Sequence, residues 1–147
     1  MDKIGYGKDK RMLNFSIREL CHSDTATAFK FSNVPETIAV MDNLLNLIVY
    51  VLQPLRDEFG PIKVTSGFRN TRLNRLVGGS ATSNHLVGAA ADLIPQKATF
   101  KQLYDYVTTH LDYDECFIET DKKGNKWLHV AFRKGNNRKK HNPNYLA

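Results

Sequence analysis

The sequence has few cysteines and no long apolar run. Its two cysteines, Cys21 and Cys116, could pair, but neither belongs to a Cys-x-x-Cys motif. So few thiols exclude a disulfide framework, and we expect two reduced, partly buried side chains. The longest apolar stretch, around Leu44 to Leu52, is interrupted by Asn46 and is too short to cross a bilayer. We therefore expect no membrane span.

The sequence also lacks an apolar signal core after Met1-Asp2-Lys3, so we expect the chain to be cytoplasmic as synthesised. It contains no repeat, low-complexity segment or linker that would mark a second domain. With 147 residues, 41% of them hydrophobic and 24% charged, it is sized for one globular domain, which we expect to be a monomer. We predict a flexible polar arm at 1–14, the domain at 15–133 and a basic tail at 134–147.

Positive charge, in contrast, is in excess. The net charge is +6, and part of it lies near the C-terminus, at Arg133, Lys134, Arg138, Lys139 and Lys140. Such a tail attracts polyanions, whether nucleic acid, anionic wall polymers or acidic lipid surfaces. A solvated terminus with no partner is the simpler alternative, because runs of like charge are usually solvated. The sequence contains no recognised nucleic-acid motif, so we expect no specific nucleic-acid partner.

Helices are predicted from capping residues and from apolar periodicity. Ser16-Ile17-Arg18-Glu19 has the serine and glutamate of a capping box, which predicts a short helix. The longest helix is predicted to begin at Pro35, a residue suited to the first helical position, and to kink or end near Pro54. Shorter helices are predicted over 71–76 and from Thr99. The apolar side chains of the longest helix recur at steps of three and four and should face the core: Ile38, Met41, Leu45, Ile48, Leu52 and Leu55.

Four segments have the composition of β-strands. They are Ile62–Thr65, Ala89–Ile94, Cys116–Glu119 and Lys126–Phe132. A tight polar turn around Gly124 should join the last two into an antiparallel hairpin. These elements together predict an α+β domain, in which helices from Pro35 and Thr99 pack behind a small, mostly antiparallel sheet.

One stretch, residues 83–92, brings an imidazole and a carboxylate together among small and apolar residues. His85 and Asp92 are separated by Gly88, so we expect them on a loop and the strand that it enters, not on one helix face. His129 follows in an alternating, strand-like stretch. Catalytic zinc sites typically use three nitrogen or oxygen ligands and leave a fourth position for water. Two histidines and one carboxylate meet that count, so we interpret them as zinc ligands.

These motifs resemble those of the zinc D-alanyl-D-alanine carboxypeptidase family, which groups VanY-like carboxypeptidases with phage endolysin L-alanyl-D-glutamate peptidases. The resemblance covers about Phe15 to Phe132. It implies a hedgehog-type metallopeptidase fold with Zn²⁺ bound by His85, Asp92 and His129. The matching elements are Ser66-Gly67-Phe68-Arg69-Asn70 with Leu73-Asn74, then Ser83-x-His85-x-x-Gly88-x-Ala90-x-Asp92, and Trp127-x-His129.

The resemblance also implies roles for three further side chains. Arg69 would stabilise the tetrahedral oxyanion or hold the substrate carbonyl, for which a fixed guanidinium is well suited. Ser83 would orient a ligand or contact the substrate, and Trp127 would contact the substrate. A surface ion pair is the alternative for Arg69, and a plain loop hydroxyl is the alternative for Ser83.

The general base departs from the pattern of the family. Many relatives carry a glutamate a few residues before the last histidine, where this chain has Lys126. We expect Glu119 to serve instead. A three-residue turn at 123–125 would place it directly opposite His129 on the same face, whereas a two- or four-residue turn would face it away. An edge carboxylate paired to a lysine is the alternative for Glu119. Two poorer candidates for the base are Asp121 and Glu115.

The expected function is zinc-dependent hydrolysis of peptide bonds in peptidoglycan stem peptides, as a D-Ala-D-Ala carboxypeptidase or an L-Ala-D-Glu endopeptidase. Access to the cell wall would need phage lysis, a phage tail or another export route. Two other classes stay open. One is an inactive zinc-binding scaffold used for recognition, which the displaced glutamate favours. The other is a basic nucleic-acid-binding protein, suggested by the tail and by a pI near 9.4.

Overall fold

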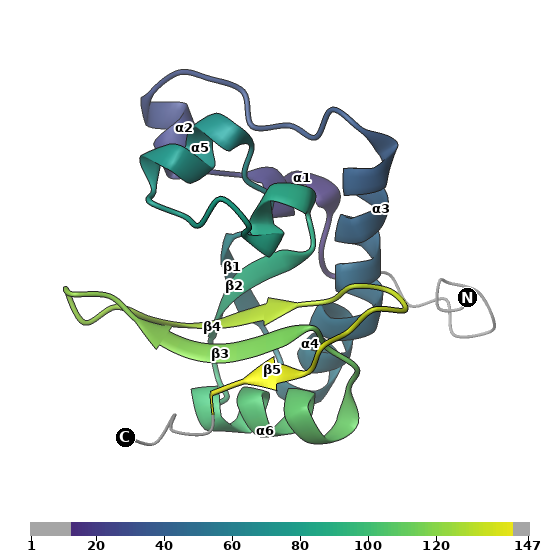
Figure 1. Ribbon diagram of the computed structural model, residues 1–147. Coiled ribbons are helices and arrows are strands. Elements are labelled where there is room, and N and C mark those ends of the chain that lie inside the picture. Colours follow the sequence, from purple (N-terminus) through teal and green to yellow (C-terminus); the bar gives the residue numbers. More distant parts are fainter. Residues whose placement is uncertain (1–12, 143–147) are drawn as a thin grey trace.

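Five strands form one sheet in the order β1-β2-β4-β3-β5 (Figure 1). The computed structural model describes residues 13–142. All neighbouring strands are antiparallel except β3 and β5, which are parallel. The predicted α+β class with a mostly antiparallel sheet is therefore confirmed. The strands are β1 Ile62–Ser66, β2 Ala90–Pro95, β3 Glu115–Thr120, β4 Lys126–Ala131 and β5 Lys140–His141.

Helical segments precede the first strand, lie between successive strands along the chain and pack against the sheet. The α-helices are α1 Ile17–Cys21, α2 Asp24–Ala28, α3 Ile38–Leu47, α4 Gln53–Phe59, α5 Thr71–Leu76 and α6 Phe100–His110. A π-helical segment, η1 Ile48–Leu52, joins α3 to α4, and a short 3-10 turn, η2 Asn84–Val87, precedes β2. Most of the predicted N-terminal arm, residues 1–12, and the last five residues of the predicted tail lie outside the described residues.

The two faces of the sheet have different roles, as strand β4 illustrates. Leu128 and Val130 are fully buried and belong to the same apolar cluster as Leu103 and Val107 of helix α6. Side chains alternate between the faces of a strand, so His129 between them projects from the other face. Helix α6 packs against β2, β3 and β4. The sheet therefore presents one face to the helical core and keeps the other for polar side chains.

The longest helical run differs from its prediction in where it begins and in which side it buries. It begins at Ile38, not at Pro35, because the side chain of Thr37 accepts the N–H of Val40 and caps it. Ile38 is 73% exposed, so it does not face the core. Met41 and Leu45 are also exposed, at 37% and 44%, whereas Leu44 and Leu47 are buried, so before the π-helical segment the buried side differs from the predicted one. The side chains that are at most 1% exposed are Leu44, Leu47, Ile48, Val51, Leu52 and Leu55.

Pro54 does not end the helical run, which continues to Phe59 and stops at Gly60 with φ +83°. The proline lies in the first turn of α4, directly after the π-helical segment, where the missing N–H costs little because the hydrogen-bond pattern already changes. By length and hydropathy, the run Ile38–Phe59 could cross a membrane. Its fully buried side chains are those of a core helix, which passes the same test.

The C-terminal segment differs from the predicted solvated tail as far as residue 142. Strand β5 pairs with β3, and Arg138 donates two side-chain hydrogen bonds, at 2.9 and 2.7 Å, to the fully buried carboxylate of Asp114. The backbone N–H of Arg138 and the side-chain amide of Asn84 also bond this carboxylate. Arg138, which the sequence predicts to be solvated, thus neutralises the buried charge of Asp114 beside strand β3.

Substitution Asp114→Asn is expected to destabilise the fold at neutral pH. Burial opposes ionisation of Asp114, but the bonds from Arg138 outweigh it and lower the pKa of the carboxyl to about 2 from 3.8. We expect a loss of about 1–2 kcal/mol of unfolding free energy, discounted because Arg138 is half exposed to solvent.

The stabilisation from Asp114 is fully present above its unfolded pKa and is lost as pH falls toward 2. Urea titrations of both proteins between pH 7 and pH 2 measure the effect. The difference between them should shrink below about pH 4. A difference that stays constant down to pH 2 would contradict this assignment.

Candidate metal centre

His85 is held by the turn that precedes strand β2. The hydroxyl of Ser83 accepts the N–H of His85 and caps η2, and Gly88 ends the turn with φ +76°. A side chain at Gly88 would come within 2.8 Å of the Val40 carbonyl, so this turn packs directly on helix α3. The imidazole, 2% exposed, bonds the Gly67 carbonyl oxygen through Nδ1 at 2.6 Å. That bond requires a proton on Nδ1 and leaves the lone pair of Nε2 free.

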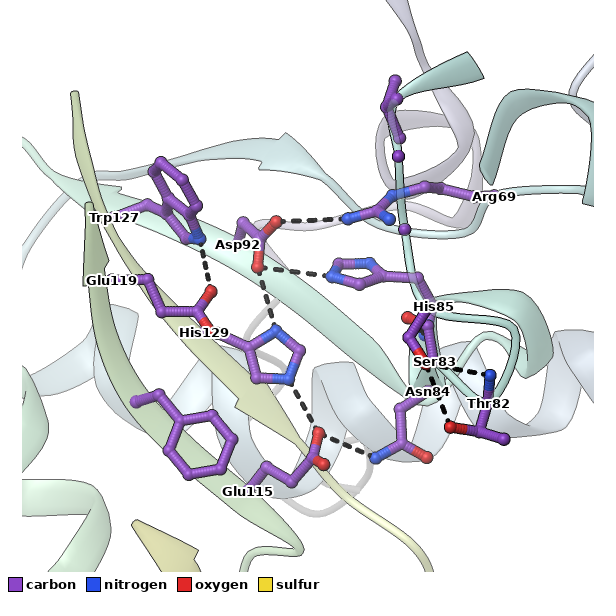
Figure 2. A pocket seen from close by; sticks show the side chains of 15 residues that line it. Arg69, Thr82, Ser83, Asn84, His85, Asp92, Glu115, Glu119, Trp127 and His129 are labelled. Carbon is purple, nitrogen blue, oxygen red and sulfur yellow. Dashed lines mark hydrogen bonds and ion pairs between the residues drawn. The ribbon is translucent and has the colours of Figure 1, made fainter. Parts of the chain in front are cut away.

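Asp92 and His129 face each other across neighbouring strands. They are direct partners in the β2–β4 register, and His129 Nδ1 lies 3.1 Å from Asp92 Oδ1. His85 Nε2 lies 3.3 Å from the same oxygen (Figure 2). One ligand atom from each of the three residues lies within 4.8 Å of the others, and all three residues are buried. The predicted ligands are therefore brought together.

The local chemistry of these residues fits a cation. Within the described residues, His85 Nε2 is a buried polar atom with no hydrogen-bond partner, an arrangement that proteins rarely leave unexplained. Burial opposes ionisation of Asp92, yet the bond from His129 and the nearby imidazole of His85 hold its pKa below the ordinary value. Burial likewise opposes protonation of His129, but its bonds to Asp92 and Glu115 raise its pKa to about 9. Two imidazole nitrogens and a carboxylate around one point suit zinc.

Arg69 is anchored beside the cluster by its own neighbours. Its guanidinium donates to the Ser66 hydroxyl at 3.1 Å and to the Asn74 side-chain oxygen at 2.9 Å. Its Nη2 lies 3.6 Å from Asp92 Oδ2, and the side chain is 13% exposed. Burial lowers the pKa of Arg69, whereas the charges of Asp92 and Glu119 act against that shift. The Arg69 guanidinium is therefore held in a fixed position beside the His85–Asp92–His129 cluster, which we call the metal cluster.

Glu119 faces the site, but it does not lie opposite His129 as the three-residue turn predicted. Phe117 is the partner of His129, and Glu119 is the partner of Trp127. Five residues, 121–125, separate the last paired residues of the hairpin, so the register moves by two positions. An even shift keeps side chains on the same face. The Glu119 carboxylate accepts the Trp127 indole N–H at 2.8 Å, and its charge acts on both His129 and Arg69.

The Asp121 side chain determines the longer connection in the hairpin. Its carboxylate accepts the backbone N–H groups of Lys123 and Asn125, both at 2.9 Å, and Gly124 adopts φ +89°. Such local bonds from an aspartate favour a turn over further strand pairing. Asp121 therefore serves the hairpin tip and lies outside the cavity, in keeping with its low rank as a base.

Glu115 is the site residue whose position the sequence least suggested. Its carboxylate lies 2.8 Å from His129 Nε2, and this bond is the largest cause of its lowered pKa. The strand was predicted to begin one residue later, at Cys116, which left Glu115 outside the alternating pattern. A signal was present, because residues four apart on a strand share a face and Glu119 had already been assigned to the site.

The metal cluster lies in a cavity of about 440 Å³. Ser83, besides capping His85, contributes to the cavity wall, and the Trp127 ring contributes on the side of the hairpin. Both residues predicted to contact substrate therefore line the space where a substrate would bind. The lining residues that carry charge or coordinate through nitrogen are Arg69, His85, Asp92, Glu115, Glu119 and His129.

Comparison with known proteins agrees with this arrangement. A family model described as peptidase M15 matches residues 14–131, a range that includes Arg69 and all three candidate ligands. The chain belongs to the peptidase M15 family. The zinc D-Ala-D-Ala carboxypeptidase of Streptomyces albus G is 36% identical over 85 residues, which are 55% of this chain and 31% of that relative. The family expected from the motifs is thus confirmed.

Membership of the M15 family supports a zinc peptidase and fits what the cavity can do chemically. The cluster can hold a divalent ion, Arg69 offers a fixed positive charge, and Glu119 offers a carboxylate held by an indole. Hydrolysis of an amide needs an electrophilic centre, a base and a group that stabilises the oxyanion. This M15 chain has a candidate for each.

Proposed function

We propose that this chain is a zinc-dependent peptidase that hydrolyses peptide bonds in peptidoglycan stem peptides. The observation that carries the proposal is the buried His85–Asp92–His129 cluster, in which His85 Nε2 has no hydrogen-bond partner among the described residues. His85, Asp92 and His129 would hold the ion. When bound, zinc supplies a Lewis acid and a water acidic enough to ionise near neutral pH.

The residues of the chain supply the other groups. Glu119 takes the proton of the attacking water and later delivers it to the leaving amine, as a general base and then a general acid. The indole of Trp127 holds the Glu119 carboxylate in one orientation. Arg69, fixed by Ser66 and Asn74, stabilises the negative charge that develops on the scissile carbonyl oxygen.

Support for the substrate class comes from the relative and from charge. The matched relative is named as a D-Ala-D-Ala carboxypeptidase, and stem peptides carry free carboxylates. A net charge of +6 favours anionic substrates and an anionic wall around them. The two reaction types in this class differ in product, because a carboxypeptidase releases one terminal residue and an endopeptidase divides the stem.

Zinc content and peptide hydrolysis measured on one preparation test the proposal. We expect about one zinc per chain by elemental analysis, and cleavage of peptidoglycan fragments that is lost on chelation and restored by zinc. Mass spectrometry of the products identifies the bond. Bound zinc with no cleavage of any fragment would favour the recognition scaffold, and a wild-type chain without zinc would contradict the metal assignment itself.

Substitution Gly79→Ala is expected to slow hydrolysis without loss of zinc. A methyl group at Gly79 would lie 2.1 Å from Asn74 Oδ1 and 2.6 Å from Arg69 Nη1, so the guanidinium must move. A displacement of about 1 Å in a catalytic site can cost about 100-fold, and we expect kcat to fall about 10- to 100-fold. Steady-state kinetics and zinc analysis on the same samples measure both effects.

Gly78→Asn is the matched control for this substitution. Gly78 has φ +76°, which asparagine tolerates, and no atom lies within 4 Å of the added Cβ. Its kcat should stay close to that of the wild type. Equal losses in the two variants would mean that general loosening of the loop, and not the position of Arg69, governs the rate.

A further inference from the structure

We propose that Glu115 is a positioning residue that orients His129 and keeps its proton on the nitrogen that faces away from the metal cluster. The inference rests on the proposed function, because it concerns the same metal site. It assigns a role to a carboxylate that the catalytic steps above do not use. It also connects the C-terminal segment to the site, because Arg138 of that segment bonds Glu115.

The two nitrogens of His129 have different partners. Nδ1 lies 3.1 Å from Asp92 Oδ1 within the metal cluster, whereas Nε2 lies 2.8 Å from Glu115 Oε1 (Figure 2). An ionised carboxylate can only accept, so the proton of this bond belongs to Nε2. A neutral imidazole carries one N–H, and with that proton on Nε2 the lone pair of Nδ1 would bind the ion, which would replace the direct bond from Nδ1 to Asp92. Metal-ligating histidines almost always donate their other N–H in this way.

Glu115 is itself held at both oxygens. Asn84 donates to Oε1 at 2.9 Å, and Arg138 donates to Oε2 at 3.1 Å. Both donors also bond the buried Asp114 carboxylate, so the four side chains form one connected network. The Glu115 side chain is only 18% exposed. It therefore cannot rotate away from His129 without breaking bonds from two other segments.

The same geometry separates the role of Glu115 from that of Glu119. The two nitrogens of an imidazole point in divergent directions, so a carboxylate bonded to Nε2 lies on the side of the ring away from a metal at Nδ1. Glu115 is thus poorly placed to reach a water on the ion. Glu119 lies four residues along the same face of β3, bonded to Trp127, and its charge acts on Arg69. One strand face supplies both the orienting carboxylate and the base.

Zinc affinity of the Glu115→Ala and Glu115→Gln variants tests the proposal. Loss of an outer partner of a ligating histidine typically costs 10- to 100-fold in metal affinity, and we expect the zinc Kd of Glu115→Ala to rise by about that factor. Glu115→Gln keeps an oxygen that can accept the N–H and should fall between Glu115→Ala and the wild type. Competition with a chromophoric chelator measures the Kd, and thermal unfolding of the metal-free proteins checks folding.

Asp121→Asn is the control, because it removes a carboxylate of the same hairpin that lies outside the cavity, and its zinc Kd should stay within about twofold of wild type. A spectroscopic readout separates orientation from general stability. In protein loaded with NMR-active cadmium and labelled histidine, the metal should couple to Nδ1 of His129, and the Nε2 proton should exchange slowly. In Glu115→Ala that proton should exchange rapidly, and in Glu115→Gln at an intermediate rate.

The outcomes distinguish this inference from the function on which it rests. Wild-type protein that binds no zinc contradicts the proposed function. If wild type binds zinc, and Glu115→Ala binds it equally well with the same protected proton, the role of Glu115 is wrong and the metal site stands. Coupling of cadmium to Nε2 of His129 would also overturn it. If Glu115→Ala does not fold, proton exchange in Glu115→Gln decides, and wild-type exchange there counts against the proposal.

Discussion

Replacement of Glu119 by glutamine is expected to abolish most hydrolysis of peptidoglycan peptides while the zinc content stays at the wild-type level. General acid–base groups typically contribute 10²- to 10⁴-fold to rate, and we expect kcat to fall by about that range. Glutamine has nearly the same shape and can still accept the Trp127 N–H, but it cannot take a proton from water. The loss should appear in kcat rather than in KM.

Asp121→Asn is the matched control for Glu119→Gln, because it removes a carboxylate from the same hairpin. Among residues 13–142, Asp121 bonds only within the hairpin tip, and it does not line the cavity. Its kcat should therefore stay near that of the wild type. Single-turnover rates of hydrolysis of a defined peptidoglycan fragment, measured together with zinc content, distinguish the two variants. Wild-type turnover by Glu119→Gln would show that another group acts as the base.

The second large effect is expected at Asp92, whose loss should remove zinc and activity together. Asp92 Oδ1 lies 3.1 Å from one candidate imidazole and 3.3 Å from the other, so it supplies the only negative charge among the three ligands. Asp92→Ala leaves two neutral nitrogens. The loss of a ligand should exceed the 10- to 100-fold known for outer partners, and we expect the zinc Kd to rise by at least about 10³-fold.

Chelator competition measures zinc binding by Asp92→Ala, and hydrolysis at saturating zinc shows whether activity returns. The conservative surface change Asp42→Asn, on the exposed side of α3, provides the control and should bind zinc like wild type. Zinc binding by Asp92→Ala at wild-type affinity would mean that the ion binds elsewhere. Loss of zinc with full retention of hydrolysis would contradict a zinc mechanism.

Much of the metal site could be predicted because its evidence is local in the sequence. His85, Asp92 and His129 each lie in a short motif of recognisable composition, and alternation alone placed His129 on the polar face of its strand. The side of Glu119 was also predicted correctly, although from the wrong turn. Three- and five-residue connections are both odd, so either one brings Glu119 to the face of His129.

The missed features depend on interactions between distant residues. The partner of Arg138 is Asp114, 24 positions earlier, and nothing near either residue indicates the pair. The first half of the longest helical run buries Leu44 and Leu47 where Met41 and Leu45 were predicted, because a run this rich in apolar residues offers more than one stripe at steps of three and four. The position of Glu115 depended on a strand boundary, which is the least certain part of such predictions.

The pairing of β2 with β4 has a consequence for how the protein matures. Asp92 and His129 are 37 residues apart, and between them the chain must form α6 and strand β3. Contacts between residues so far apart in the sequence form late in folding, because the entropy cost of closing the loop comes before the contacts contribute any stabilising free energy. The ion-binding geometry therefore exists only once the sheet is assembled, and a nascent or misfolded chain has no complete cluster to capture metal. Acquisition of metal should thus report completed folding.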